Sequence, residues 1–115
     1  MIYQWHIFLA QLAPVCGSEQ SGYRPVLVVS REQINQILPV INVIPLTSLK
    51  SKTRIIYSNE VLIPKDSATL SVDSIALCYQ IRTLDKGRLG KEIGVIQDIT
   101  LIHVIHEALR FQLQL

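Results

Sequence analysis

The stretch PVINVIPLTS, residues 39–48, is almost entirely apolar and rich in valine and isoleucine. Side chains branched at Cβ favour strands, so this stretch predicts one. A proline cannot donate to a sheet ladder, so Pro45 indicates an edge position or a bulge near the end of the strand. The strand closes on two hydroxyl side chains, those of Thr47 and Ser48.

Similar runs on both sides of this stretch predict further strands at 5–12, 24–30, 55–63 and 74–84. The segments between them read as one helical turn at 31–38, a basic loop at 49–54 and a hairpin or connection at 85–94. From Asp98, which suits a helix N-cap, to about Leu113 the apolar residues recur at spacings of three and four. Short strands followed by one amphipathic helix predict a mainly β (α+β) fold, a small barrel or curled sheet with a C-terminal helix packed on it.

The composition bounds the class of protein. A chain of 115 residues predicts one domain, 1–115, and the mean hydropathy of +0.31 indicates an apolar subunit interface. No run approaches the ~20 apolar residues of a membrane span, and the N-terminus lacks signal-peptide features, so we expect a cytoplasmic protein without membrane contact. Two isolated cysteines imply neither a zinc knuckle nor a disulfide scaffold. A net charge of +2 is compatible with nucleic acid but does not establish it.

The loop GSEQSGYRP, residues 17–25, gathers Ser18, Glu19, Gln20 and Arg24 directly before a predicted strand. Its glycines permit positive φ angles, so the loop can fold back toward a ligand. Arg24 precedes a proline and is therefore extended, and a guanidinium held by a strand suits bidentate capture of a phosphate. On spacing alone, a solvated loop with a surface arginine is the more frequent explanation.

Two further polar clusters are open to the same two interpretations. The Thr47 and Ser48 hydroxyls can donate to a phosphate oxygen or cap a turn. Gln80 and Arg82 alternate with Ile81 and so are expected to share one strand face. That face could contact bases or phosphates, or be the wet side of a half-buried sheet.

The histidines have no clear chemical role in the sequence. His103 and His106 lie three apart on the predicted helix, but no third ligand has suitable spacing, so we expect no metal site. His6 has no evident partner. No P-loop, dinucleotide fingerprint, Gly-x-Ser-x-Gly elbow or zinc motif occurs.

Three motifs in order carry a resemblance to a known family. GSEQSGYRPVLVVS at 17–30 is followed by VIPLTS at 43–48 and, after Asp73-Ser74 and Ala-Leu-Cys at 76–78, by QIRTLDKGRL at 80–89. This pattern resembles the MazF/PemK (Kid) family of type II toxin endoribonucleases. The resemblance extends from about Phe8 to the C-terminal helix.

The resemblance implies an SH3-like barrel of the CcdB/MazF/PemK type that forms a homodimer. It also implies metal-independent, cofactor-free cleavage of single-stranded RNA (mRNA) at short sequences, and a MazE-like antitoxin that blocks the RNA groove. The family's catalytic arginine and threonine correspond to Arg24 and Thr47. Glu19 is the candidate base. The implied RNA contacts are Ser18, Gln20, Ser48, Gln80 and Arg82.

The chain departs from the family pattern in strand one, where Trp5-His6 and Gln11 replace glycine and acidic residues. Because loops such as 49–54 help to choose bases in the family, the cleaved sequence cannot be carried over. The alternative is a non-catalytic binding protein of the same fold, either a CcdB-like gyrase inhibitor or a degenerate toxin that only binds its antitoxin. The presence of both Arg24 and Thr47 favours the enzyme.

Overall fold

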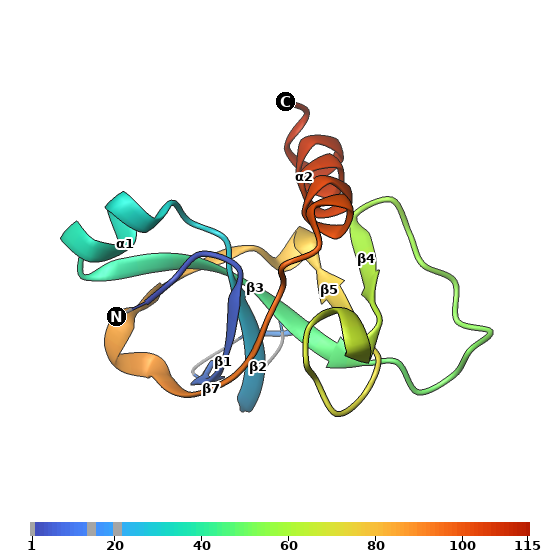
Figure 1. The fold of residues 1–115 in the computed structure, drawn as a ribbon, viewed down its shortest axis with the longest axis horizontal. Coiled ribbons are helices and arrows are strands. Elements are labelled where there is room, and N and C mark those ends of the chain that lie inside the picture. The colour runs from blue at the N-terminus through green and yellow to red at the C-terminus, as the bar shows by residue number, and fades with distance from the viewer. Residues whose placement is uncertain (1, 14–15, 20–21) are drawn as a thin grey trace.

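The computed structural model describes residues 2–13, 16–19 and 22–115. They form a curled sheet of seven antiparallel strands with a long C-terminal helix (Figure 1). The strands are β1 (His6–Gln11), β2 (Tyr23–Val28), β3 (Val40–Ser48), β4 (Glu60–Ile63), β5 (Ser74–Leu77), β6 (Arg82–Asp85) and β7 (Leu89–Val95). The helices are α1 (Glu32–Ile37) and α2 (Ile99–Leu113), with 3₁₀ turns η1 (Lys65–Ser67), η2 (Cys78–Gln80) and η3 (Lys86–Arg88). The predicted mainly β fold with a C-terminal helix is confirmed.

Strand β3 organises the sheet, whose order is β4-β5-β3-β2-β1-β7. One side of β3 pairs with β2, and the other pairs first with β6 and then with β5. Of the two positions predicted for Pro45, an edge strand or a bulge, the edge strand was therefore wrong. Pro45 lies between the pairs Val43↔Arg82 and Leu46↔Ala76, so its missing N–H falls where β3 changes partner.

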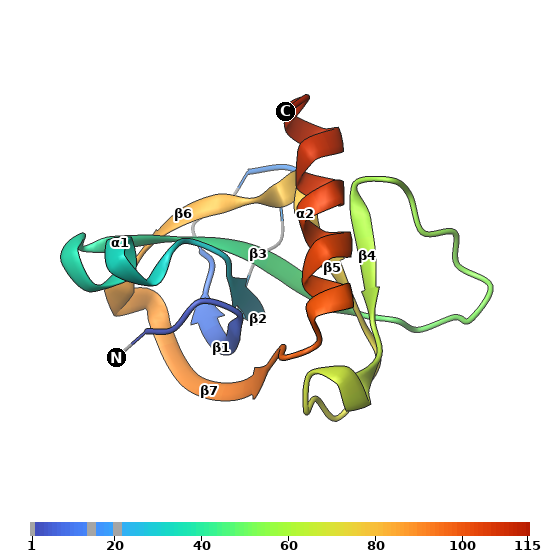
Figure 2. The ribbon, with the colours of Figure 1, turned by 45° about the horizontal axis from the view of Figure 1, so that its top comes forward.

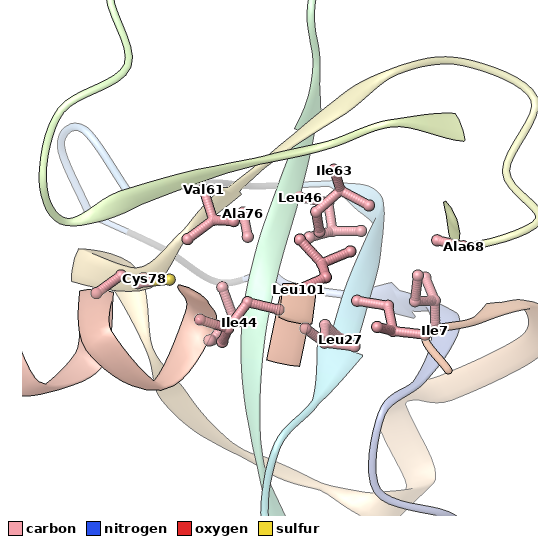
Figure 3. Close-up of a cluster of buried hydrophobic side chains, with 13 residues drawn as sticks. Ile7, Leu27, Ile44, Leu46, Val61, Ile63, Ala68, Ala76, Cys78 and Leu101 are labelled. Carbon is pink, nitrogen blue, oxygen red and sulfur yellow. The ribbon is translucent and has the colours of Figure 1, made fainter. Parts of the chain in front are cut away.

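Both faces of the central strands are largely buried, which explains why most of their residues are apolar. On one face, Ile7, Leu27 and Ile44 pack into the cluster shown in Figure 3, to which α2 contributes Leu101. The opposite face carries a second cluster, which contains Phe8, Val26, Val28, Ile41, Val43 and Leu84. The curled sheet thus encloses one core and holds α2 against the other.

Helix α2 has the boundaries that the periodicity predicts. The Asp98 carboxylate accepts a hydrogen bond of 2.9 Å from the Thr100 N–H and so caps the first turn. Leu101, Ile105 and Ala108 are buried against the sheet. Figure 2 shows the helix lying across the sheet beside β4 and β5. In the described part of the chain, no helix has the length and apolar character needed to span a membrane.

The expected single strand at 74–84 is two strands with a turn between them. Leu46 and Val43 of β3 are three residues apart in the sequence. Their pairing partners, Ala76 in β5 and Arg82 in β6, are six residues apart. The three additional residues form the 3₁₀ turn η2. Gln80 therefore ends a turn and Arg82 begins β6, so the prediction that they share one strand face was wrong.

Two other boundaries differ from the prediction. The strand expected at 55–63 begins only at Glu60, because Ser58 and Asn59 form a turn before it. Residues 85–94, expected to be a hairpin or connection, contain most of β7, which pairs with β1. Gly94 permits this packing, because a Cβ there would lie 2.5 Å from the Ala68 carbonyl oxygen. Because β7 contains glycines and charged residues, a prediction based on runs of apolar residues does not identify it as a strand.

Candidate active site

A pocket of about 480 Å³ opens where β2 and β3 end beside the 69–74 segment. Its apolar wall comes from β1, β2, β3, β7 and Leu70 and Val72. Its polar lining consists of Arg24, Thr47, Ser48, Thr69, Ser71 and Ser74. The first three of these are residues that the sequence singled out, from two motifs about twenty positions apart.

Strand register explains why Arg24 and Thr47 meet. Strands β2 and β3 are antiparallel, and Val26 lies opposite Pro45. Continuing this register by two residues places Arg24 opposite Thr47. Residues opposite each other in an antiparallel pair project from the same face, and both residues line the pocket. The pairing of two rigid strands therefore brings the guanidinium and the hydroxyl to one wall.

The pocket lining is suited to an anion. Among its described lining residues, Arg24 is the only charged one, and it is accompanied by five hydroxyl side chains and no carboxylate. A neighbouring hollow shares Thr47 and Ser48 and adds Lys50 and Arg54. Guanidinium, ammonium and hydroxyl groups all donate to phosphate oxygens. The surface from Arg24 to Lys50 can therefore hold a phosphodiester backbone.

The loop that introduces Arg24 is braced by its own side chain. The Glu19 carboxylate accepts a hydrogen bond of 2.9 Å from the Cys16 N–H, and the Glu19 N–H donates to the Cys16 carbonyl at 3.2 Å. Gly17 and Gly22 adopt positive φ angles of 57° and 79°, as the sequence predicts. Ser18 and Glu19 are exposed and lie outside the described lining of the Arg24 pocket. The contact seen for Glu19 is a loop brace, and its role as a base stays a prediction.

The other predicted RNA contacts are placed differently. Gln80 is half-buried in η2, and Arg82 donates from Nη1 to the Leu12 carbonyl at 3.4 Å. Neither belongs to the described lining of the Arg24 pocket. Gln20 lies outside the described residues. The structure therefore unites Arg24, Thr47 and Ser48 in one pocket, and it holds Arg82 against Leu12, the residue that follows β1.

Sequence comparison places these features in a family. Residues 3–113 match a family described as "PemK-like, MazF-like toxin of type II toxin-antitoxin system". The chain belongs to this toxin family. Endoribonuclease MazF from Staphylococcus epidermidis is 38% identical over 104 residues, which cover 90% of this chain and 85% of that protein.

Solved structures agree with this toxin fold. The crystal structure of MazF (Form-I) from Deinococcus radiodurans is 26% identical and covers 97% of this chain and 96% of its own, with a TM-score of 0.79. A MazE-MazF structure (Form-II) from the same organism is 25% identical and covers 96% of this chain and 94% of its own, with a TM-score of 0.72. The barrel that the sequence resemblance implies is thereby confirmed for this family member.

Three polar residues of the toxin's pocket were missed by sequence reasoning. Thr69 and Ser71 come from a segment that reads as a connection between two strands, and Ser74 is the first residue of the predicted strand 74–84. Ser74 is buried and lies opposite Ser48 in the pairing of β5 with β3. The available signal was the recurrence of hydroxyl residues in the segment 67–74. Only the folded structure shows that these hydroxyls line the same pocket as Thr47.

The histidines of the toxin lie away from this pocket. His6, which has no evident partner in the sequence, lies with Nδ1 3.1 Å from the Glu92 carboxylate and with its ring beside Tyr3. His103 and His106 stack at 6.4 Å between ring centroids, and Trp5 meets His106 edge-on at 5.3 Å. These contacts explain the three side chains as packing groups at the β1 and α2 surface.

The loop between β3 and β4 extends away from the sheet (Figure 1), and a half-buried ion pair between Arg54 and Glu60 ties it to the start of β4. Arg54 contacts the Glu60 carboxylate through both terminal nitrogens, at 3.0 and 2.9 Å, and the Tyr57 N–H donates to the same carboxylate. The Glu60 side chain is only 3% exposed. Hydrogen bonds from Arg54 outweigh the effect of burial and lower the pKa of Glu60. The ion pair thereby fixes the loop that starts beside Thr47 and Ser48.

We expect Glu60→Gln to lower the free energy of unfolding at neutral pH by about 2 kcal/mol, because a charged, bidentate contact is lost. A carboxyl group whose pKa is lowered in the folded state stabilises the fold above its unfolded pKa. This contribution is lost as the pH falls below about 4.5 and through the lower folded value. Urea unfolding of both proteins from pH 7 to pH 3 measures the effect. A stability difference that does not shrink toward pH 3 would contradict the assignment.

Proposed function

We propose that this chain is a sequence-selective, metal-independent endoribonuclease toxin that cleaves single-stranded RNA, in the cell mRNA. The observation that carries the proposal is the shared pocket of Arg24 and Thr47, whose described lining contains a guanidinium donor and hydroxyl groups and no carboxylate. The relative from Staphylococcus epidermidis, named endoribonuclease MazF, supports the same activity. The pocket thus has the chemistry to bind a phosphodiester and stabilise additional negative charge on it.

In this reaction the RNA supplies its own nucleophile. The 2′-oxygen forms a bond to the adjacent phosphorus while the bond from phosphorus to the 5′-oxygen breaks. The products are a 2′,3′-cyclic phosphate and a 5′-hydroxyl. A base removes the proton of the 2′-hydroxyl, and a proton is delivered to the leaving 5′-oxygen. The protein therefore needs to orient the chain, transfer protons and stabilise a phosphorane.

Arg24 is assigned to the phosphorane and the leaving group. A guanidinium has a pKa above about 12 in its ordinary state and is a poor base at neutral pH, but it donates two parallel hydrogen bonds to phosphate oxygens. The Thr47 and Ser48 hydroxyls add neutral donors on the opposite strand. Glu19 remains the candidate base or RNA contact: its Oε1 accepts a hydrogen bond from the Cys16 N–H, and the carboxylate keeps further lone pairs that can take a proton.

The partners follow from the same assignment. We infer a homodimer, supported by exposed apolar side chains such as Ile55, Phe111 and Leu113. We infer a MazE-like antitoxin as the second protein partner, supported by the MazE-MazF structure from Deinococcus radiodurans. Gln80, Arg82, Ser18 and Gln20 are proposed as further RNA contacts, in a single domain that acts in the cytoplasm.

The decisive experiment incubates the purified protein with a mixed RNA pool in EDTA and maps the new ends. We expect cuts at a defined short sequence that leave cyclic or 3′-phosphate ends, and no cut where the attacking nucleotide is 2′-deoxy. Cleavage of that deoxy substrate would overturn the 2′-hydroxyl mechanism. Failure to cut RNA, with loss of gyrase activity or with antitoxin binding alone, would establish the non-catalytic alternative.

Thr47→Ala is expected to lower single-turnover cleavage on the order of tenfold or more, since a preorganised donor is removed from the pocket. The loss should be smaller than for Arg24, because a neutral hydroxyl stabilises less charge than a guanidinium. Thr47→Ser keeps the hydroxyl and should retain most activity. Thr100→Ala, at an exposed threonine on α2, is the matched control. An unchanged rate in Thr47→Ala would return Thr47 to a turn-capping role.

A further inference from the structure

Thr69 has a backbone conformation that its residue type disfavours. Its φ angle is +54°, in the left-handed region that glycine adopts readily and that residues branched at Cβ rarely enter. The Leu70 N–H donates to the Lys65 carbonyl at 2.9 Å, a six-to-one closure after the 3₁₀ turn η1. Glycine is the usual residue at the left-handed position of this motif. A threonine in this conformation lowers the stability of the fold, so folding alone does not explain the presence of threonine at position 69.

The surrounding structure holds Thr69 in this conformation. Ala68 is fully buried, and its carbonyl accepts the Val95 N–H of β7 at 3.1 Å. The same carbonyl lies against Gly94, where no side chain could fit. At the other end of the turn, the Asp73 carboxylate accepts the Lys65 N–H at 2.8 Å. The turn is therefore rigid, and it presents the Thr69 side chain at the wall of the pocket that contains Arg24 and Thr47.

The Thr69 hydroxyl is already engaged as a hydrogen-bond donor within the protein. Its hydrogen is used, because Oγ1 donates to the Ala68 carbonyl at 2.6 Å. The oxygen keeps lone pairs that can accept a hydrogen bond from a ligand. A phosphate oxygen cannot donate such a bond, whereas the 2′-hydroxyl of a ribose can. Thr69 is exposed at the pocket and is therefore complementary to the sugar rather than to the phosphate.

We propose that Thr69 is a specificity-determining residue whose Oγ1 accepts a hydrogen bond from a ribose 2′-hydroxyl of the bound RNA. This inference rests on the proposed function, because it assigns the sugar next to the phosphodiester held by Arg24. A neutral hydroxyl is a poor base, so the contact is with a ribose neighbouring the one that attacks. Through this contact the pocket distinguishes RNA from DNA. The unfavourable backbone conformation of Thr69 is explained by its role in positioning the Oγ1 acceptor.

The test compares Thr69→Gly, Thr69→Val and Thr69→Ser with the wild-type protein. One probe is an RNA oligonucleotide that contains the mapped cut site with a single 2′-deoxy nucleotide at the cut, and the other is the all-DNA oligonucleotide of the same sequence. We expect Thr69→Gly and Thr69→Val to bind the RNA probe roughly three- to tenfold more weakly, the equivalent of one lost hydrogen bond. Their affinity for DNA should be unchanged, and Thr69→Ser should bind as the wild type does.

Stability separates this role from a structural one. Thr69→Gly should raise the melting temperature, because the left-handed conformation suits glycine, even though RNA binding becomes weaker. Thr69→Val keeps the shape without the hydroxyl. Equal RNA affinity in all variants, or an equal loss for RNA and DNA, would overturn the assignment. If wild-type protein cuts RNA and the variants bind it normally, only this inference fails; if wild-type protein neither cuts nor binds RNA, the proposed function fails with it.

Discussion

Arg24→Ala is expected to lower the single-turnover rate of RNA cleavage on the order of 10²-fold or more, as loss of a preorganised charge donor commonly does. Arg24 is the only charged group in the described lining of the pocket, so no neighbouring cation there can replace it. The loss should appear in the chemical step rather than in binding, because the charge on the phosphorane exceeds that on the bound phosphodiester. Rapid-mixing measurements at saturating protein give this rate directly.

Two further variants make the Arg24 result interpretable. Arg24→Lys keeps the positive charge but removes the planar pair of donors, so it should recover only part of the rate. Arg31→Ala changes an exposed arginine beside α1, outside the described lining of the pocket, and should cleave as the wild type does. Near wild-type cleavage by folded Arg24→Ala protein would remove Arg24 from the catalytic machinery.

Ile44→Ala is expected to destabilise the fold by about 3 kcal/mol, because it leaves a cavity in a well-packed core. Ile44 is fully buried in the cluster between the sheet and α2 (Figure 3). It lies on β3 three residues before Thr47, so a loss of order there would also reach the pocket. Urea unfolding should show a lower midpoint with an unchanged slope. Wild type and variant are compared at one protein concentration, since a dimer unfolds in a concentration-dependent way.

Ile37→Ala is the matched control for the core. Ile37 ends α1, and its side chain is 75% exposed, so the same chemical change should alter the unfolding free energy by less than about 0.5 kcal/mol. A similar loss in both variants would contradict the assignment of the Ile44→Ala effect to a cavity in the core.

The elements predicted correctly are those whose signal is local. Asp98 and the spacing of Leu101, Ile105 and Ala108 sufficed for α2, and the apolar run of β3 sufficed for its existence. The prediction failed where tertiary packing overrode the pattern. Pro45 lies in a central strand because β3 changes partner there. Strand β7 contains glycine because Gly94 touches the Ala68 carbonyl.

The candidate site also contains some residues that the sequence identified and others that only the fold revealed. Arg24 and Thr47 were identifiable from their motifs and the family resemblance, and they share a pocket in the structure. Gln80 and Arg82 were read as one strand face, which the 3₁₀ turn between β5 and β6 removes. Thr69 was missed because a single threonine in a connecting segment carries no signal until its φ angle and its neighbours are known.

By itself the sequence determined the family, the mainly β fold with its terminal helix, and the two residues assigned to the reaction, because motif order, side-chain period and residue type are written along the chain. Only the tertiary structure decided which hydroxyls share a pocket with Arg24. The register of β2 and β3 places Thr47 opposite Arg24, and the hydrogen-bonded turn at 65–70 holds Thr69 at the wall of the same pocket. Such proximity depends on long-range pairing and packing, for which no local stretch of residues carries the information.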